Sequence, residues 1–133
     1  MSNKLIIYTD GCSKGNPGPA GIGFIVLQDN GLHPVHTFSE NIGVTTNNQA
    51  EYRALLAALE YAVSLRAAEV EVRSDSELIV NQMNGIYRVR KAELKPLYLK
   101  AKGLSGSIGN FRIRYVPREQ NRGADELANR ALE

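Results

Sequence analysis

The stretch KLIIYTDGCSKGNPGPAGIGFIVL, residues 4–27, decides the architecture that the rest of the chain must complete. Residues 4–10 and 21–27 are apolar and rich in β-branched side chains, which is typical of central strands in a sheet. Between them, residues 11–20 are dense in glycine and proline, which indicates a turn. Residues 35–42 predict a third strand, so the chain is expected to open with an antiparallel meander.

A long helix is expected to follow the third strand. Thr46 and Gln49 have the spacing of a capping box, in which two side chains satisfy backbone groups at the start of a helix. Beyond them, small and apolar residues recur at helical spacing, so they share one face that can pack on the sheet. The residues of this face are Ala50, Ala54, Leu55, Ala58, Leu59 and Ala62.

The second half of the chain alternates between strand and helix patterns. Strands are predicted over residues 70–75 and 110–116, and helices over residues 76–83, 92–104 and 122–132. The complete order is three strands, a helix, a strand, two helices, a strand and a helix. This order predicts an α/β fold in which helices cover the faces of a mixed sheet.

The composition is that of an ordinary globular protein, with 43% hydrophobic and 23% charged residues. The sequence has no internal repeat or linker, so we expect one domain over residues 1–133. The lone Cys12 cannot form an internal disulfide, which fits a reducing compartment. The apolar run at residues 5–8 is too short for a signal peptide or a membrane span. We therefore expect a cytoplasmic protein, with no membrane contact and a monomeric state as the default.

Charge is distributed unevenly along the chain, although the net charge is only +2. Residues 1–83 hold five Lys or Arg against nine Asp or Glu, and residues 119–133 hold two against four. Residues 84–118, which we call the basic segment, hold nine against one. Such a segment suits a polyanion, because lysine and arginine displace counterions from phosphates. The alternative is an ordinary solvated helix face.

Four acidic residues occupy defined positions in the predicted elements. Asp10 ends the first strand, Glu51 lies in the first turns of the long helix, Asp75 ends the fourth strand, and Asp125 opens the last helix. Acids at strand ends and helix starts can converge, because open α/β sheets place their sites at the carboxyl ends of strands. Oxygen ligands without histidine or cysteine favour Mg²⁺ or Mn²⁺ over zinc.

Each acid also has a purely structural interpretation. Asp10 with Gly11 could form a plain turn, and Asp75 could cap the helix that follows it. Glu51 and Asp125 could simply complement helix dipoles. Spacing along the sequence does not distinguish these interpretations from a shared site.

Four motifs carry a resemblance that covers nearly the whole chain. They are YTDGCSKGNPGPAG at 8–21, TTNNQAEYRALLAAL at 45–59, SDSELIVNQ at 74–82 and REQNRGADELAN at 118–129. Together, and in this order, they resemble the type 1 ribonuclease H family. The resemblance implies a ribonuclease H-like fold with a five-stranded sheet, in which three antiparallel strands are followed by two parallel ones.

The resemblance also implies an activity. It predicts an endonuclease that hydrolyses the RNA strand of RNA/DNA hybrids with two Mg²⁺ ions, for which Mn²⁺ can substitute. Asp10 would bridge both ions, and Glu51, Asp75 and Asp125 would complete their ligands. The products would carry 5′-phosphate and 3′-hydroxyl ends. The alternative is a non-catalytic nucleic-acid-binding module on the same fold, but four repelling acids are costly without a cation.

Further residues match positions that contact substrate in this family. The amides of Asn16, Asn47 and Asn48 are expected to contact RNA, the backbone near Ser13 and Gly15 to approach it, and Thr46 to bind a DNA phosphate. Such small polar groups can recognise 2′-hydroxyls across a shallow minor groove. The alternative role for these residues is turn and cap chemistry, which favours the same amino acids.

The sequence departs from the family pattern in three places. Residues 116–121 hold no histidine, where many relatives have one before the last aspartate, and Arg118 or Glu119 could fill that place. Glu77 stands where glutamine is common, which removes a predicted minor-groove contact. The chain has no tryptophan and no long basic protrusion, so residues 88–102 are expected to hold the hybrid more weakly.

Two other nuclease classes fit less well. A proofreading-type exonuclease would need a glutamate two residues after Asp10, and that position is Cys12. A Holliday-junction resolvase would be longer and dimeric.

Overall fold

The computed structural model describes residues 4–28 and 33–133 and has a five-stranded sheet in the order β3-β2-β1-β4-β5. The strands are β1 (Lys4–Ser13), β2 (Gly18–Gln28), β3 (Pro34–Thr45), β4 (Glu69–Ser74) and β5 (Asn110–Tyr115). The pairs β1–β2 and β2–β3 are antiparallel, whereas β1–β4 and β4–β5 are parallel. The mixed sheet predicted from the sequence is therefore confirmed.

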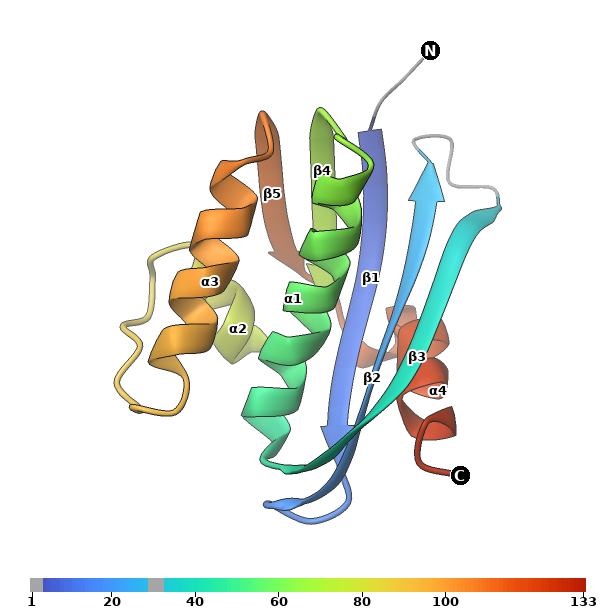
Figure 1. Cartoon of the computed structure of the whole chain (residues 1–133), viewed down its shortest axis with the longest axis vertical. Coiled ribbons are helices and arrows are strands. Elements are labelled where there is room, and N and C mark those ends of the chain that lie inside the picture. Colours follow the sequence, from blue (N-terminus) through green and yellow to red (C-terminus); the bar gives the residue numbers. More distant parts are fainter. Residues whose placement is uncertain (1–3, 29–32) are drawn as a thin grey trace.

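Helices cover both faces of this sheet. They are α1 (Asn47–Ser64), α2 (Glu77–Met83), α3 (Lys95–Gly106) and α4 (Arg122–Arg130), with a short 3₁₀ helix at Arg118–Gln120. α1 packs on β1 and is flanked by α3, whereas α4 packs on β1 and β2 from the other face (Figure 1). Across residues 4–28 and 33–133, no helix is long and apolar enough to cross a membrane.

The core lies between α1 and the sheet. Every residue of the predicted α1 face is buried, and it meets alternate residues of β1 and β4 such as Ile7 and Val72. Burying an aliphatic side chain of this size contributes about 1.5–3 kcal/mol, so this layer holds α1 firmly on the strands. The capping box is also present, because the Gln49 N–H donates to Thr46 Oγ1 at 3.3 Å. The helix that carries Glu51 therefore starts where the sequence predicts.

The first hairpin differs from the sequence prediction. β1 does not end at Asp10 but continues through Ser13, and only residues 14–17 separate it from β2. The glycines of β2 have another role than turn formation. A Cβ on Gly21 or Gly23 would collide with α4, so glycine at these two positions lets α4 pack closely on the strand. Asp10 therefore lies inside a strand, which also excludes the plain-turn interpretation.

Other element boundaries shift by a few residues. β3 begins one residue earlier and ends three residues later than the predicted range 35–42. α4 ends at Arg130 rather than at residue 132, and α3 spans Lys95–Gly106 instead of 92–104. None of these shifts alters the order of the elements.

Candidate active site

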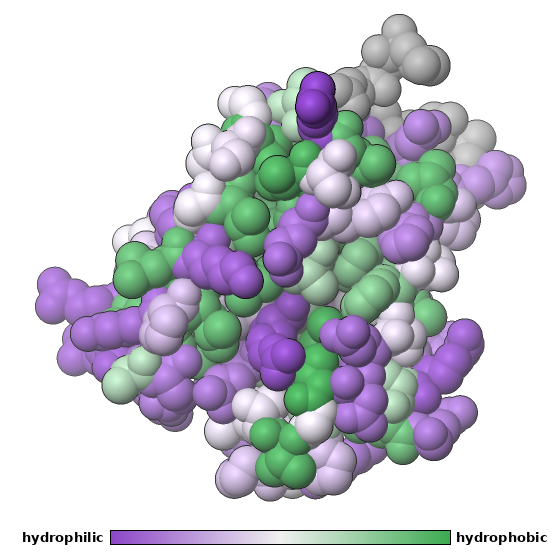
Figure 2. All heavy atoms as spheres, viewed as in Figure 1, coloured by the Kyte–Doolittle hydropathy of each residue, from purple (hydrophilic) through white to green (hydrophobic). Residues whose placement is uncertain are grey.

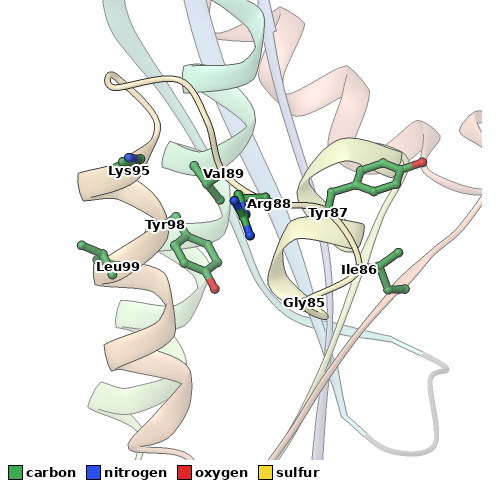
Figure 3. Close-up of a pocket in the computed structure, with 8 residues that line it drawn as sticks. All are labelled: Gly85, Ile86, Tyr87, Arg88, Val89, Lys95, Tyr98 and Leu99. Carbon is green, nitrogen blue, oxygen red and sulfur yellow. The ribbon is translucent and has the colours of Figure 1, made fainter.

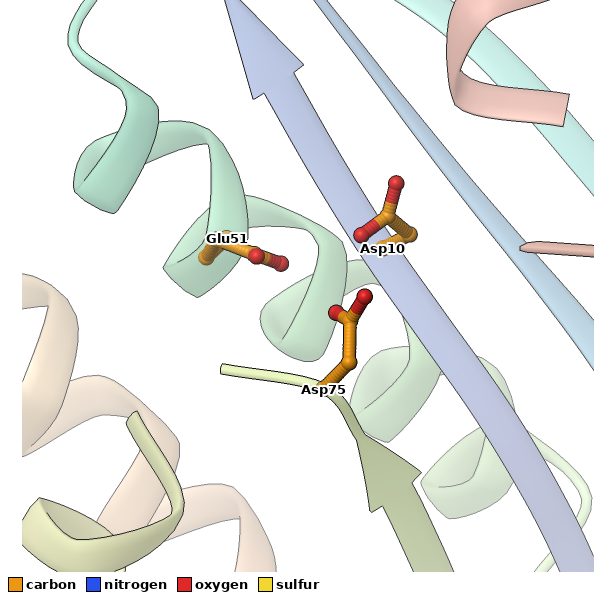
Figure 4. Close-up of side chains that lie close together, drawn as sticks. All are labelled: Asp10, Glu51 and Asp75. Carbon is orange, nitrogen blue, oxygen red and sulfur yellow. The ribbon is translucent and has the colours of Figure 1, made fainter. Parts of the chain in front are cut away.

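Three acidic side chains from different elements meet at one end of the sheet. Asp10 projects from β1 and Glu51 from α1, and Asp75 is the residue that follows β4. Each offers a carboxylate oxygen within 4.8 Å of the others (Figure 4). They line a cavity of about 310 Å³. We call Asp10, Glu51 and Asp75 the carboxylate cluster. The structure thus brings together three of the four acids singled out from the sequence.

Gly11 explains how α1 comes close enough to deliver Glu51. A Cβ at this position would overlap the backbone carbonyl of Ala50, so only glycine permits the observed contact between α1 and β1. The Gly11 N–H then donates to Glu51 Oε1 at 2.9 Å and fixes that carboxylate. The density of glycine and proline after Asp10 suggested only a turn at Gly11, and no sequence signal indicated this contact.

Asp75 is not a helix cap, which was its structural alternative. The cap of α2 is Ser76, whose side chain accepts a hydrogen bond of 3.2 Å from the Ile79 N–H. The backbone N–H of Ser76 in turn donates to Ser74 Oγ at 3.1 Å. The local hydrogen bonds of this turn are therefore made by serines, and the Asp75 carboxylate turns toward the cluster.

Burial and mutual repulsion disfavour charge in the cluster. Burial, followed by repulsion from Glu51 and Asp75, raises the pKa of Asp10 to about 10. Burial and the charge of Asp75 raise the pKa of Glu51 to about 8, although the Gly11 N–H acts in the opposite direction. Asp10 Oδ2 is buried and has no hydrogen-bond partner among the described residues. A divalent cation would satisfy this oxygen and remove the repulsion, so the residues fit a metal site.

Asp125 borders the cavity but stands outside the tightest group of acids. It lies in the first turn of α4, and its Oδ1 is 3.6 Å from the Arg118 guanidinium. Asn129 Nδ2 donates to the same Oδ1 at 3.2 Å. The start of α4 is held near Asp10 by Asn121, whose side-chain N–H donates to the Thr9 carbonyl at 2.9 Å. Sequence reasoning did not identify this anchor.

The predicted substrate-contacting residues join the glycine-rich turn to the start of α1. The Ser13 N–H donates to Asn47 Oδ1 at 3.2 Å, and the Asn47 N–H donates to Asn16 Oδ1 at 3.0 Å. Gly15 lies between Ser13 and Asn16 in the sequence and has a φ of 109°, a backbone angle that favours glycine. Asn47 also lines the cavity of the carboxylate cluster. These residues therefore make the expected turn and cap hydrogen bonds, and Asn47 lies beside the acids.

A smaller cavity of about 170 Å³ lies next to this turn. Asn16, Thr46 and Asn48 line it together with Lys91 and Glu93 of the basic segment. A hydroxyl, two amides and an ammonium group are suitable donors for a phosphate.

The segment before α4 is partly helical rather than a loop. Arg118 and Glu119 both belong to the 3₁₀ helix, and Arg118 lines the cavity of the carboxylate cluster. Tyr115 and Cys12 line the same cavity, although the sequence analysis gave them no role there. Glu77 is exposed in the first turn of α2.

Comparison with known proteins places this site in a family. A family model described as "Reverse transcriptase-like" matches residues 8–131. The crystal structure of RNase H1 from Halobacterium salinarum superposes with a TM-score of 0.93 at 40% identity, and the match covers 97% of both chains. The chain belongs to the type 1 ribonuclease H family.

Two further members of the ribonuclease H family extend this comparison. LC11-RNase H1, solved in complex with an RNA/DNA hybrid, matches with a TM-score of 0.89 at 46% identity over 96% of this chain and 95% of that one. The bifunctional protein Rv2228c of Mycobacterium tuberculosis is 42% identical over 98% of this chain. The chain spans 36% of that protein and 65% of the curated ribonuclease HI of Halobacterium salinarum.

Proposed function

We propose that this protein is an endoribonuclease that hydrolyses the RNA strand of RNA/DNA hybrids. The observation that carries the proposal is the buried carboxylate cluster, which shares its cavity with Asn47, a predicted substrate contact. The hybrid-bound structure of LC11-RNase H1 supports the choice of substrate, because that relative has the same fold and 46% identity. The non-catalytic alternative gives no reason to keep three acids whose repulsion raises the pKa of Asp10 and Glu51.

In this proposal, Asp10, Glu51 and Asp75 would hold two Mg²⁺ ions, with Asp125 as the fourth acid. When bound, the ions supply the charge that activates a water and neutralises the departing 3′-oxygen, and Mn²⁺ can replace Mg²⁺. The products would then carry 5′-phosphate and 3′-hydroxyl ends. Because the pKa values of Asp10 and Glu51 are raised, metal binding should release protons.

The remaining residues of the site orient the substrate. The Gly11 N–H holds Glu51 so that one of its oxygens faces the cluster. Asn16, Asn47 and Asn48 read 2′-hydroxyls, the backbone at Ser13 and Gly15 allows close approach of the RNA strand, and Thr46 holds a DNA phosphate with Lys91. Selectivity for RNA must come from these groups, because carboxylates and metals act on a phosphodiester whichever sugar it carries.

Arg118 and Glu119 are proposed to take the place of the missing loop histidine. The Arg118 guanidinium lies beside Asp125 at the edge of the cavity, where it can neutralise a phosphate that leaves the site. Glu119 lines the adjoining cavity with Arg118. We further propose that the protein acts as a cytoplasmic monomer.

The decisive experiment uses end-labelled duplexes of one sequence in three forms: RNA/DNA, DNA/DNA and RNA/RNA. The proposal expects Mg²⁺-dependent cuts within the RNA strand of the hybrid, fragments with 5′-phosphate ends, and an intact DNA/DNA duplex. Binding of the hybrid without any cleavage would favour the non-catalytic module. Cleavage of DNA/DNA as fast as the hybrid would reject the ribonuclease assignment and leave the metal site standing.

A further inference from the structure

The outer face of β4 and β5, on the side of the sheet opposite α1, carries several cations. Here α4 packs on β1, β2 and β3, whereas β4 and β5 continue beyond those strands. Val72 and Ile113 point into the core from these strands, so the residues that alternate with them point outward. We call the four cations of this surface the arginine face. They are Lys4, Arg73, Arg112 and Arg114.

The register of the parallel strands sets the arginines in two rows. Arg73 is the Cα partner of Arg114, and Arg112 is the partner of Glu71. Two residues along a strand cover about 6.6 Å, and neighbouring strands lie about 4.8 Å apart. Cations therefore recur on a scale at which one strand of nucleic acid can present successive phosphates to them.

The positive charge of this face is only partly neutralised within the protein. Glu71 accepts from Arg73 at 2.7 Å and Arg114 at 2.9 Å, and Lys4 lies 3.9 Å from Glu71 and 3.8 Å from Glu69, so two carboxylates serve three cations. The side chain of Arg114 is 51% exposed all the same. Arg112 is exposed and pairs with no carboxylate anywhere in residues 4–28 and 33–133. The arginine face can therefore attract an external anion.

This face is continuous with the carboxylate cluster. Arg73 donates to the Tyr8 hydroxyl at 2.6 Å and lies over its ring, with Cζ 5.3 Å from the centroid. Tyr8 precedes Asp10 by two residues on β1 and so shares its side of the sheet, which is the side of α4. At the other strand, Tyr115 follows Arg114 directly and lines the cavity of the cluster. The arginine face begins where the cavity ends.

We propose that the arginine face binds the phosphates of a single-stranded RNA segment that continues from the RNA strand of the hybrid. The inference rests on the proposed function, because it assumes that the RNA strand passes over the carboxylate cluster. A duplex held by residues 13–16 and the start of α1 lies against the side of α1. Nucleic-acid duplexes are stiff over the length of a small protein, so the hybrid cannot bend around the sheet edge, whereas a single strand can.

The test compares binding of substrates that share one hybrid core: a blunt hybrid, hybrids whose RNA strand continues as a short single strand at its 5′ or its 3′ end, and hybrids whose DNA strand continues by the same length. Binding is measured in an Asp10→Asn background, so that the substrate survives. We expect tighter binding with the RNA extension at one of its ends and little gain with the DNA extension. This gain should fall about threefold per phosphate contact between about 50 and 200 mM salt, since each contact adds about 0.7 to the salt slope.

Arg112→Gln is the cleanest variant, because Arg112 pairs with no described carboxylate and its loss leaves the Glu71 contacts intact. It should remove roughly one contact from the gain, and Arg112→Gln with Arg114→Gln should remove most of it. The matched control is Arg130→Gln, which removes an exposed cation of α4 paired to Glu126 and should leave the gain unchanged. Thermal melting checks that each variant folds.

The outcomes separate this inference from the proposed function. Equal binding of blunt and extended hybrids, an equal gain with DNA, or an equal loss in the Arg130→Gln control would overturn the arginine face as an RNA site. In each case the blunt hybrid would still be cut by the unaltered protein. Failure of the unaltered protein to cut the blunt hybrid in Mg²⁺ would instead count against the proposed function.

Discussion

The carboxylate cluster and the ion pairs of Glu71 lie at different places in the same sheet, and burial has opposite consequences for their acids. Asp10 and Glu71 are about equally buried, with 4% and 6% exposure. Acids surround Asp10, and its pKa is raised. Burial alone would also raise the pKa of Glu71, but hydrogen bonds from Arg114 and Arg73 outweigh it and the pKa is lowered. Glu71 has arginine partners that outweigh its burial, whereas the neighbours of Asp10 are acids that add to the effect of burial.

This difference shows how stability and function are divided along β4. Glu71 is stabilised by partners that the fold itself supplies, so it supports the native state at neutral pH. Ionisation of the cluster weakens the native state, because the pKa values of Asp10 and Glu51 are raised, and acids perturbed in this way are typical of functional sites. The surface view shows hydrophilic side chains spread over much of the face seen in Figure 1 (Figure 2). Exposed charge alone therefore does not mark a site, and the partners of each charge do.

The largest expected effect comes from replacing Asp10 of the carboxylate cluster. Asp10→Asn should lower hybrid cleavage by several orders of magnitude, because it removes the negative charge of a buried carboxylate, one oxygen of which has no partner among the described residues, and with it a proposed metal ligand. The same change should raise the melting temperature in metal-free buffer by removing repulsion from Glu51 and Asp75. Cleavage assays and thermal melts of one preparation measure both effects. Near-normal turnover would contradict the two-metal proposal.

The next prediction tests whether the residues proposed to select RNA act independently of metal binding at the carboxylate cluster. Asn47→Ala should lower hybrid cleavage by on the order of tenfold, the loss expected for a hydrogen bond worth 1–3 kcal/mol. Metal binding, measured by calorimetry, should hardly change, because Asn47 is not an acid of the cluster. Asn16→Ala is the companion variant, since Asn16 accepts from the Asn47 N–H at 3.0 Å. A large loss of metal affinity in either variant would show that these amides support the acids instead.

The third prediction concerns the ion pairs of Glu71 and their contribution to stability. Glu71→Gln should lower the free energy of unfolding by about 1–3 kcal/mol, because charged hydrogen bonds from Arg73 and Arg114 lose their acceptor charge. Half of the Arg114 side chain is exposed, which keeps the effect at the lower end of that range. Urea titration measures it. Glu69→Gln is the control, because Glu69 is a more exposed partner of Lys4 at 3.8 Å and should matter much less.

The smallest effect is the pH dependence of stability in metal-free buffer, which has opposite signs in the two regions. The raised pKa values of Asp10 and Glu51 stabilise the folded state at low pH, and this contribution is lost as pH rises toward about 8 and 10. The lowered pKa of Glu71 stabilises the folded state above the ordinary glutamate value, and this contribution is lost as pH falls through the lowered one. The free energy of unfolding should depend less on pH at the alkaline end in Asp10→Asn and at the acid end in Glu71→Gln. An unchanged profile in both variants would assign the slopes to other groups.

Much of the fold was predictable because local patterns agree with the tertiary structure. The capping box at Thr46 and the apolar face of α1 each specify a local element, and the four motifs then fix the order of the strands. The positions of the acids near strand ends and a helix start allowed Asp10, Glu51 and Asp75 to meet, but only the resemblance to the ribonuclease H family predicted that they do. Asp10 itself was misplaced at a strand end, because a segment dense in glycine and proline suggested a turn.

The contacts that the sequence did not predict are those between distant elements. Arg114 and Glu71 are 43 residues apart, and only the β4–β5 register brings them together. The pairing of Asp125 with Arg118 depends on a 3₁₀ helix that has no strong sequence signal. The 550 Å³ cavity between α3 and the segment that follows α2, lined by Tyr87 and Tyr98 among others, likewise depends on how that segment lies beside α3 (Figure 3).

The contact between Gly11 and α1 has a consequence for protein design. The position of Glu51 depends on a hydrogen bond from the Gly11 N–H. It also depends on the absence of a side chain at Gly11, which lets α1 lie in contact with β1. Transplanting three acidic side chains onto another scaffold would therefore not reproduce this metal site. A designer would first need to build a helix in backbone contact with a strand, and only then choose the acids.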